Sequence, residues 1–154
     1  MYKIILSTLL LSSLSFAETS YSFLGAQTSY LNYENGSAPS VGLKYGIQRG
    51  MWRSSLNLDY ATKSNEKLTS FIIQIDKGIM KSLTKKSSFK PHIGFSLGMV
   101  QHKKDISETG YGIGLNTGVT YLLNKNIDLD LSYRYFSVSS IQNLKSLNSL
   151  TFSL

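Results

Sequence analysis

Strict alternation of apolar and polar residues is the feature that most limits what this chain can form. In IDLDLSYRY, residues 127–135, every odd position is apolar or aromatic and every even position is Asp, Ser or Arg. A β-strand places successive side chains on opposite faces, so the segment predicts a strand with one apolar and one polar face. The apolar face points inward in a soluble sheet and outward in a membrane barrel. The rest of the sequence has to decide between them.

Similar segments recur along the chain. They lie at 20–33, 41–48, 52–60, 71–81, 89–99, 110–121 and 127–135, and an eighth ends at Leu154. Polar or glycine-containing breaks separate them, and the breaks on the outer side are expected to be loops of about seven to nine residues. The alternation of the first segment blurs at Gln27 and Ser29. Eight strands with no helix between them predict an all-β, antiparallel up-and-down barrel.

The N-terminus indicates export. The segment MYKIILSTLLLSSLSFA has one positive charge at Lys3, an apolar stretch too short to span a bilayer, and small residues before a cut after Ala17. This order predicts a cleaved signal peptide over residues 1–17 and a single mature domain over 18–154; a buried N-terminal helix is the alternative. The chain has no cysteine, so it forms no disulfide and no thiolate metal site. After the signal, no apolar run approaches the length of a membrane helix, so any membrane-spanning elements are strands.

The glycines favour lipid on the outside of the barrel. Eight of the twelve fall on the polar face of the alternating segments, at positions 42, 46, 94, 98, 110, 112, 114 and 118. The interior of an eight-stranded barrel is just wide enough for side chains to fill, and small residues leave room there for a few large polar ones. A soluble barrel would need bulky apolar residues on its inner face, which this glycine-rich face does not supply.

Charged and aromatic residues fit the same arrangement. Buried charges persist only when they are paired, and the polar face carries equal numbers of both signs. Aromatic residues fall into two bands, as the two membrane interfaces select. The predicted interior charges are Lys44, Arg53, Asp59, Asp76, Lys90, Asp128, Asp130 and Arg134. The predicted interface aromatics are Trp52, Phe89, Tyr121 and Phe152 on the periplasmic side and Tyr60, Phe71, Tyr111, Tyr133 and Tyr135 on the outer side.

Three segments, KPHIGFSLGM, GYGIGLNTGVTYLLN and DLDLSYRYF, resemble the small eight-stranded outer-membrane barrels of Gram-negative bacteria, the family of the opacity proteins and the OmpA transmembrane domain. The last strand, LNSLTFSL, has the alternation and the aromatic residue, Phe152, that the barrel-assembly machinery reads in such proteins, but it ends in Leu154 where that pattern has Phe. The resemblance implies a Gram-negative outer-membrane location and motifs that are architectural rather than catalytic.

The expected function is a structural or surface-interaction role: membrane integrity, adhesion or contact with lipopolysaccharide. Lysines at the outer strand ends, Lys63, Lys67, Lys103 and Lys104, are candidates for contact with lipopolysaccharide phosphates. No open pore is expected, because eight strands leave no free lumen. The basic residues are scattered among turns, which excludes a nucleic-acid-binding face.

Two alternatives remain open. One is a lipid A-modifying enzyme, although neither His92 nor His102 begins the His-x-Ser motif that one family of such enzymes carries. The other is a secreted soluble barrel that binds a small apolar ligand. No cofactor is expected, and the two histidines lie about 33 Å apart along one strand, too far to share a metal ion.

Overall fold

The computed structural model describes residues 20–34, 36–63, 66–79, 88–103, 107–124, 126–141 and 144–154. The predicted signal peptide lies outside these residues. The chain forms eight strands: β1 (Ser20–Tyr33), β2 (Gly36–Arg49), β3 (Trp52–Lys63), β4 (Glu66–Gly78), β5 (Phe89–Lys103), β6 (Ser107–Leu122), β7 (Asp128–Ser139) and β8 (Ser146–Ser153). We call the rim where β1 begins the periplasmic rim and the opposite one the outer rim, following the orientation expected for an exported chain.

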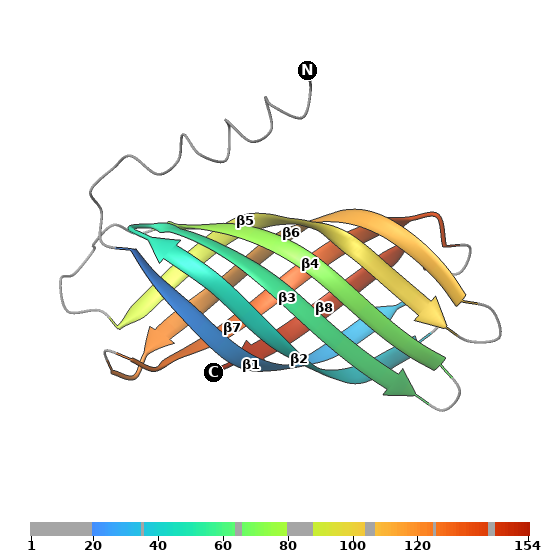
Figure 1. Cartoon of the computed structure of the whole chain (residues 1–154), viewed down its shortest axis with the longest axis horizontal. Helices are drawn as coiled ribbons and strands as arrows, with labels where there is room; N and C mark the ends of the chain where they lie inside the picture. Colours follow the sequence, from blue (N-terminus) through green and yellow to red (C-terminus); the bar gives the residue numbers. More distant parts are fainter. Residues whose placement is uncertain are drawn as a thin grey trace, which may run out of the picture.

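The strands form one closed antiparallel barrel in sequence order (Figure 1), as the alternation predicted. Pairing of β1 with β8 closes the ring. A row of paired residues that starts at Phe23 of β1 and crosses each neighbouring strand in turn returns to β1 at Tyr33, ten residues farther along. This stagger tilts the strands and sets the width of the interior.

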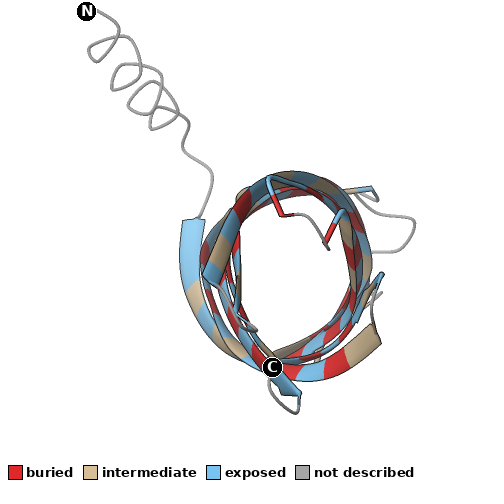
Figure 2. Ribbon diagram, turned by 90° about the vertical axis from the view of Figure 1, so that its right-hand side faces the viewer, coloured by how far each residue is buried: buried red, intermediate tan, exposed pale blue. Residues whose placement is uncertain are grey.

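The barrel is apolar on its outside and largely polar inside. Burial alternates along every strand, so that buried and exposed bands follow each other around the ring in Figure 2. Most large apolar side chains are exposed, and Leu24, Phe95 and Ile113 each expose more than 70% of their surface. This is the reverse of a soluble barrel with an apolar core, and it is the arrangement that a lipid environment requires. The prediction of a transmembrane barrel is therefore confirmed, and the soluble-barrel alternative is wrong.

In the described part of the chain, no helix is long and apolar enough to cross a membrane.

Strand β1 departs from the pattern of the others. Its odd-numbered residues face inward, so Gln27 and Ser29 are buried in the interior, but Tyr21 and Phe23 also lie on this face near the periplasmic rim. The outward positions include polar residues such as Thr28. The alternation blurred in the sequence because β1 carries aromatic residues inside and polar residues outside.

The outer connections are shorter than the sequence indicated. They span residues 34–35, 64–65, 104–106 and 140–145, not seven to nine residues each. Strands β2, β4 and β6 begin earlier than predicted because polar residues near the rim, such as Ser37 and Lys67, are still paired in the sheet. Polar strand ends and loops have the same composition at a membrane surface, so the sequence did not separate them. The fourth strand ends at Gly78, before the predicted extension toward residue 81, of which residues 80 and 81 lie outside the described residues.

Eight inward glycines lie beside a side chain of a neighbouring strand, at positions 42, 46, 94, 98, 110, 112, 114 and 118. A Cβ atom at Gly112 would lie 2.6 Å from the Phe136 ring, and one at Gly94 would clash with Asp76 Oδ1. A Cβ atom at Gly118 would likewise contact the His92 ring, at 2.8 Å. Because the neighbouring side chain occupies the volume that the glycine leaves, the interior is filled without widening the barrel.

The interior changes from polar to apolar toward the outer rim. On β7 the inward residue Arg134 is followed by Phe136, and on β8 Leu147 lies one inward step from Ser149. The same change separates Ser29 from Leu31 on β1. The apolar cluster comprises Leu31, Ala38, Ala61, Leu68, Ile72, Val100, Phe136, Val138, Ile141, Leu144 and Leu147.

Gly112→Ala is expected to destabilise the barrel by about 1–3 kcal/mol, because the added Cβ would clash with the Ser137 carbonyl oxygen as well as with the Phe136 ring. Gly78→Ala is the matched control, since its Cβ would make only ordinary contacts, the nearest at 3.6 Å to the Met51 carbonyl oxygen. Urea unfolding in lipid vesicles, followed by the fluorescence of the single tryptophan, measures both. Equal stability of the two variants would contradict the close packing at Gly112.

Candidate functional site

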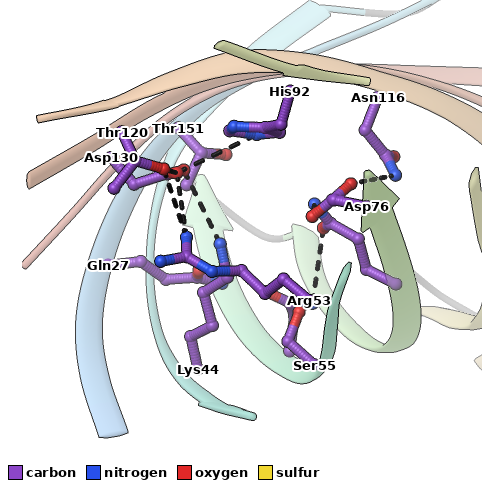
Figure 3. A network of polar contacts seen from close by, with 12 residues as sticks. Gln27, Lys44, Arg53, Ser55, Asp76, His92, Asn116, Thr120, Asp130 and Thr151 are labelled. Atoms are coloured by element: carbon purple, nitrogen blue, oxygen red, sulfur yellow. Dashed lines mark hydrogen bonds and ion pairs between the residues drawn. The ribbon is translucent and has the colours of Figure 1, made fainter. Parts of the chain in front are cut away.

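Ion pairs gather inside the barrel near its periplasmic end. Lys44 of β2 and Arg53 of β3 converge on Asp130 of β7 (Figure 3), at 3.6 Å for Lys44 Nζ–Asp130 Oδ1 and 3.2 Å for Arg53 Nη1–Asp130 Oδ2. Arg53 Nη2 donates to Asp128 Oδ2 at 2.9 Å, and Thr120 Oγ1 donates to Asp130 Oδ2 at 2.7 Å. The structure thus brings four of the eight predicted interior charges into one cluster.

Phe23 covers this cluster from β1. Its ring lies 4.7 Å from the Arg53 guanidinium carbon, within the range of a cation–π interaction. The inward turn of Phe23 therefore has a packing role, which the sequence did not indicate.

A second polar group lies farther into the barrel and is joined by amides. Gln74 Nε2 donates to Asp76 Oδ2 at 2.7 Å, while Gln74 Oε1 accepts from Arg134 Nη2. Asn116 Nδ2 also donates to Asp76, at 3.3 Å. One amide side chain thus stands between the cation and the anion, because an amide both donates and accepts.

Asp59 has a similar neutral partner. Its Oδ1 atom accepts from Gln27 Nε2, and its Oδ2 atom accepts from Ser70 Oγ at 3.4 Å. Gln27, Gln74, Asn116 and Thr120 were not among the predicted site residues. The polar parity of each strand was the available signal, but the prediction singled out charged residues only.

Lys90 is the predicted interior charge that stays outside these groups. It lies on the inward face of β5 but is exposed at the periplasmic mouth, beside a cavity of about 800 Å³. Arg53, Lys44, Asp128 and Asp130 line the inner part of the same cavity.

The nine predicted interface aromatics are all exposed on the outside of the barrel. At the periplasmic rim, Trp52 lies directly across from Lys77, whose Nζ is 5.1 Å from the indole ring, and the Phe89 and Tyr121 rings are 4.7 Å apart. Two residues lie nearer the middle of the wall than predicted. Phe152 pairs with Thr28 in the middle of β1, and Tyr133 is the sixth of the twelve residues of β7.

On β4, β5 and β6 at the outer rim, the described lysines face outward and the described glutamates face inward. Lys67 of β4 and Lys103 of β5 are direct cross-strand partners, and both are exposed on the outward face. Glu66 and Glu108 lie on the inward face. Lys63 also lies on the inward register of β3, with its Nζ close to Gly36, and Lys104 is outside the described residues.

The two histidines stand at opposite ends of β5. His92 Nε2 is 3.9 Å from Asp130 Oδ2 in the periplasmic cluster, and His102 Nε2 is 3.8 Å from Glu66 Oε2 at the outer rim. Tyr33 of β1 donates across the outer mouth to the same Glu66 oxygen at 3.2 Å. Within the described ranges, no three His, Cys, Asp or Glu side chains are grouped as a metal site requires.

The sequence model of the Opacity family porin proteins matches residues 22–153, which is nearly the whole barrel. The chain belongs to the opacity family. This membership confirms the resemblance to small outer-membrane β-barrels of Gram-negative bacteria that was drawn from the sequence. Among curated proteins, none matches this opacity-family chain significantly.

Solved structures share the fold of this opacity-family barrel. Neisserial surface protein A is 21% identical, with a TM-score of 0.68, 87% of this chain covered and 94% of that one. The N-terminal β-barrel domain of Pseudomonas aeruginosa OprF is 13% identical, with a TM-score of 0.56, 88% of this chain covered and 96% of that one. Ail, the attachment invasion locus protein of Yersinia pestis, in complex with the heparin analogue sucrose octasulfate, is 14% identical, with a TM-score of 0.50, 87% of this chain covered and 94% of that one.

Asp130→Leu is expected to cost about 3–5 kcal/mol of stability, because it leaves Lys44 and Arg53 buried without their shared carboxylate. Asp128→Leu is the matched control and should cost clearly less, since Asp128 is partly exposed and its ion pair among the described residues is with Arg53. Reversible urea unfolding in detergent or vesicles measures both. Equal losses would contradict the central place given to Asp130.

Proposed function

We propose that this opacity-family barrel is exported by a signal peptide that is cleaved after Ala17, and that it is inserted into the outer membrane. There it has a non-enzymatic surface role in which it binds lipopolysaccharide. The observation that carries the proposal is the cross-strand pair of Lys67 and Lys103 on the outward face. Like charges directly opposite each other on neighbouring strands destabilise a sheet, and a bound anion between them removes that cost. In the outer leaflet, the phosphates of lipid A are anions at this position.

The surroundings of the pair suit a phosphorylated sugar. Immediately below it on the outward face lie Thr69, Gln101 and Thr109, paired in one row across β4, β5 and β6. Gln101 Nε2 donates to Ser107 Oγ at 3.1 Å, so the amide is held on this surface. Hydroxyl and amide groups of this kind bind sugar hydroxyls and phosphate oxygens.

Apolar residues continue the patch toward the membrane centre. Phe71, Met99 and Tyr111 are paired neighbours in the next outward row and are all exposed. A lipid with a phosphorylated headgroup and acyl chains would find cations, then hydrogen-bonding groups, then apolar surface along the same three strands. The inward placement of Glu66 and Glu108 keeps the nearest described carboxylates on these strands away from the phosphates.

The complex of Ail with a sulfated heparin analogue is in keeping with a polyanion as the class of ligand proposed for this barrel.

For assembly, we propose that the barrel-assembly machinery engages the C-terminal strand through the outward residues Leu150 and Phe152 of β8 and the following Leu154, which are exposed in the described structure. Among the predicted lysines, Lys67 and Lys103 carry the lipopolysaccharide proposal, and Lys63 does not share their face.

Lys67→Gln/Lys103→Gln is expected to abolish most of the rise in unfolding temperature that lipopolysaccharide gives the refolded protein, because the paired cations are gone. Lys77→Gln is the control, an exposed lysine on the outward face of the same strand β4 at its periplasmic end. Heat-dependent mobility on SDS gels measures the unfolding temperature with intact and with dephosphorylated lipopolysaccharide.

The wild type and Lys77→Gln should respond to the intact lipid and respond much less to the dephosphorylated one. A full response of the double variant, or an equal loss in Lys77→Gln, would overturn the proposed site.

A further inference from the structure

Three outward residues form one row across β2, β3 and β4 at the periplasmic rim. Arg49 is the cross-strand partner of Trp52, and Trp52 is in turn the partner of Lys77. The three strands are consecutive neighbours in the barrel wall (Figure 1), so Trp52 lies between two cationic residues. The Lys77 ammonium lies 5.1 Å from the centre of the indole ring. We call Arg49, Trp52 and Lys77 the periplasmic row.

The backbone holds this row in place. The turn between β2 and β3 consists of two residues, Gly50 and Met51, and Gly50 has a φ of 55°, a left-handed conformation that glycine adopts readily. Gly78 at the end of β4 donates its N–H to the Met51 carbonyl oxygen at 2.8 Å. This hydrogen bond joins the turn to β4. The row therefore lies on hydrogen-bonded backbone from β2 to β4.

Charge on these three strands is divided between the two faces of the wall. Their acidic residues are Asp59, Glu66 and Asp76, and all three face inward. At the periplasmic end, Asp128 and Asp130 of β7 also line the interior. The outward face of β2, β3 and β4 at this rim thus carries positive charge, while the carboxylates lie on the other side of the wall.

Farther into the membrane, the same strands present a hydroxyl group and then apolar surface. Ser54 lies one outward step from Trp52 on β3 and is exposed. The exposed apolar and aromatic residues in its row and in the next outward row are Ile47, Ile75, Tyr45, Leu56 and Ile73. A phospholipid carries its groups in the same order, with a phosphate, then esters, then acyl chains.

We propose that the periplasmic row is a binding site for an acidic phospholipid of the periplasmic leaflet. The Arg49 guanidinium and the Lys77 ammonium can each donate to phosphate oxygens, and the indole N–H of Trp52 is a further donor between them. Cationic side chains near an anionic lipid surface attract it, and the attraction falls off within a Debye length. A headgroup that carries its own ammonium group is repelled by the same cations, so the site selects lipids with a net negative headgroup.

The site belongs to the opposite leaflet from the lipopolysaccharide site and does not depend on it. Strand β4 carries an outward lysine near each end, Lys67 at the outer rim and Lys77 at the periplasmic rim. Between them its outward residues are Thr69, Phe71, Ile73 and Ile75. Binding of an acidic phospholipid at the periplasmic row ties that end of the wall to the level of the headgroups and so sets the depth of the barrel in the bilayer.

The fluorescence of Trp52 tests the site, because Trp52 is the single tryptophan of the chain and belongs to the row. The refolded protein is placed in phosphatidylcholine vesicles that contain a minor fraction of phosphatidylglycerol with brominated acyl chains, since bromine quenches indole fluorescence on contact. Quenching by the same fraction of brominated phosphatidylcholine gives the reference. In the wild type, phosphatidylglycerol should be enriched beside Trp52 by about fivefold or more, and added salt should reduce the enrichment.

Arg49→Gln/Lys77→Gln should lose most of this enrichment, because the cations are gone while the tryptophan stays in place. Lys67→Gln/Lys103→Gln is the matched control, since it removes two positive charges from the outward face at the opposite rim and should keep the wild-type enrichment. Heat-dependent gel mobility verifies that each variant is folded. No enrichment in the wild type, full enrichment in Arg49→Gln/Lys77→Gln, or an equal loss in the control would overturn the proposed site.

Discussion

Closure of an eight-stranded ring with a ten-residue stagger determines how much side-chain volume the interior can hold, and the rest of the structure depends on it. The chain meets this limit by pairing a large inward side chain with a glycine on a neighbouring strand. Phe136 beside Gly112, Asp76 beside Gly94 and His92 beside Gly118 are three cases at different depths. Because lipid surrounds the wall, backbone groups find their partners within the ring, and the side-chain filling has to suit that ring rather than reshape it.

Within that limit the interior has two layers with different roles. The polar layer joins strands across the barrel through Asp130, Gln74 and their partners, so each side chain depends on several others. The apolar layer at the outer end excludes water and receives residues from the β7–β8 connection. Outside, the same strands offer lysines at the outer rim and apolar residues toward the membrane. The interior thus supports stability, while the outer face meets the lipids.

The strand number, their order and the inside-out faces were predictable from sequence, because alternation with a period of two and glycines on one parity depend on local geometry. Which inward residues touch was not predictable. Gln74 of β4 reaches Arg134 of β7 across the interior because closure of the ring and its register bring the two residues to similar depths. The depths of Phe152 and Tyr133 likewise follow from the stagger, which is a property of the closed ring. The pairing of Lys67 with Lys103 needed the same register. Ile141 and Leu144 carry no periodic signal, since they belong to no strand.

The most direct test of the central claim is the accessibility of single nitroxide labels placed at consecutive positions along β7 in the reconstituted barrel. Labels at Leu129, Leu131, Tyr133 and Tyr135 should collide with lipid-dissolved oxygen, and labels at Asp130, Ser132 and Arg134 should not. This expectation follows from the alternation of exposed and buried residues along the strand. An oxygen profile with the opposite parity, or with no period of two, would contradict a barrel whose apolar face meets lipid and whose polar face fills the interior.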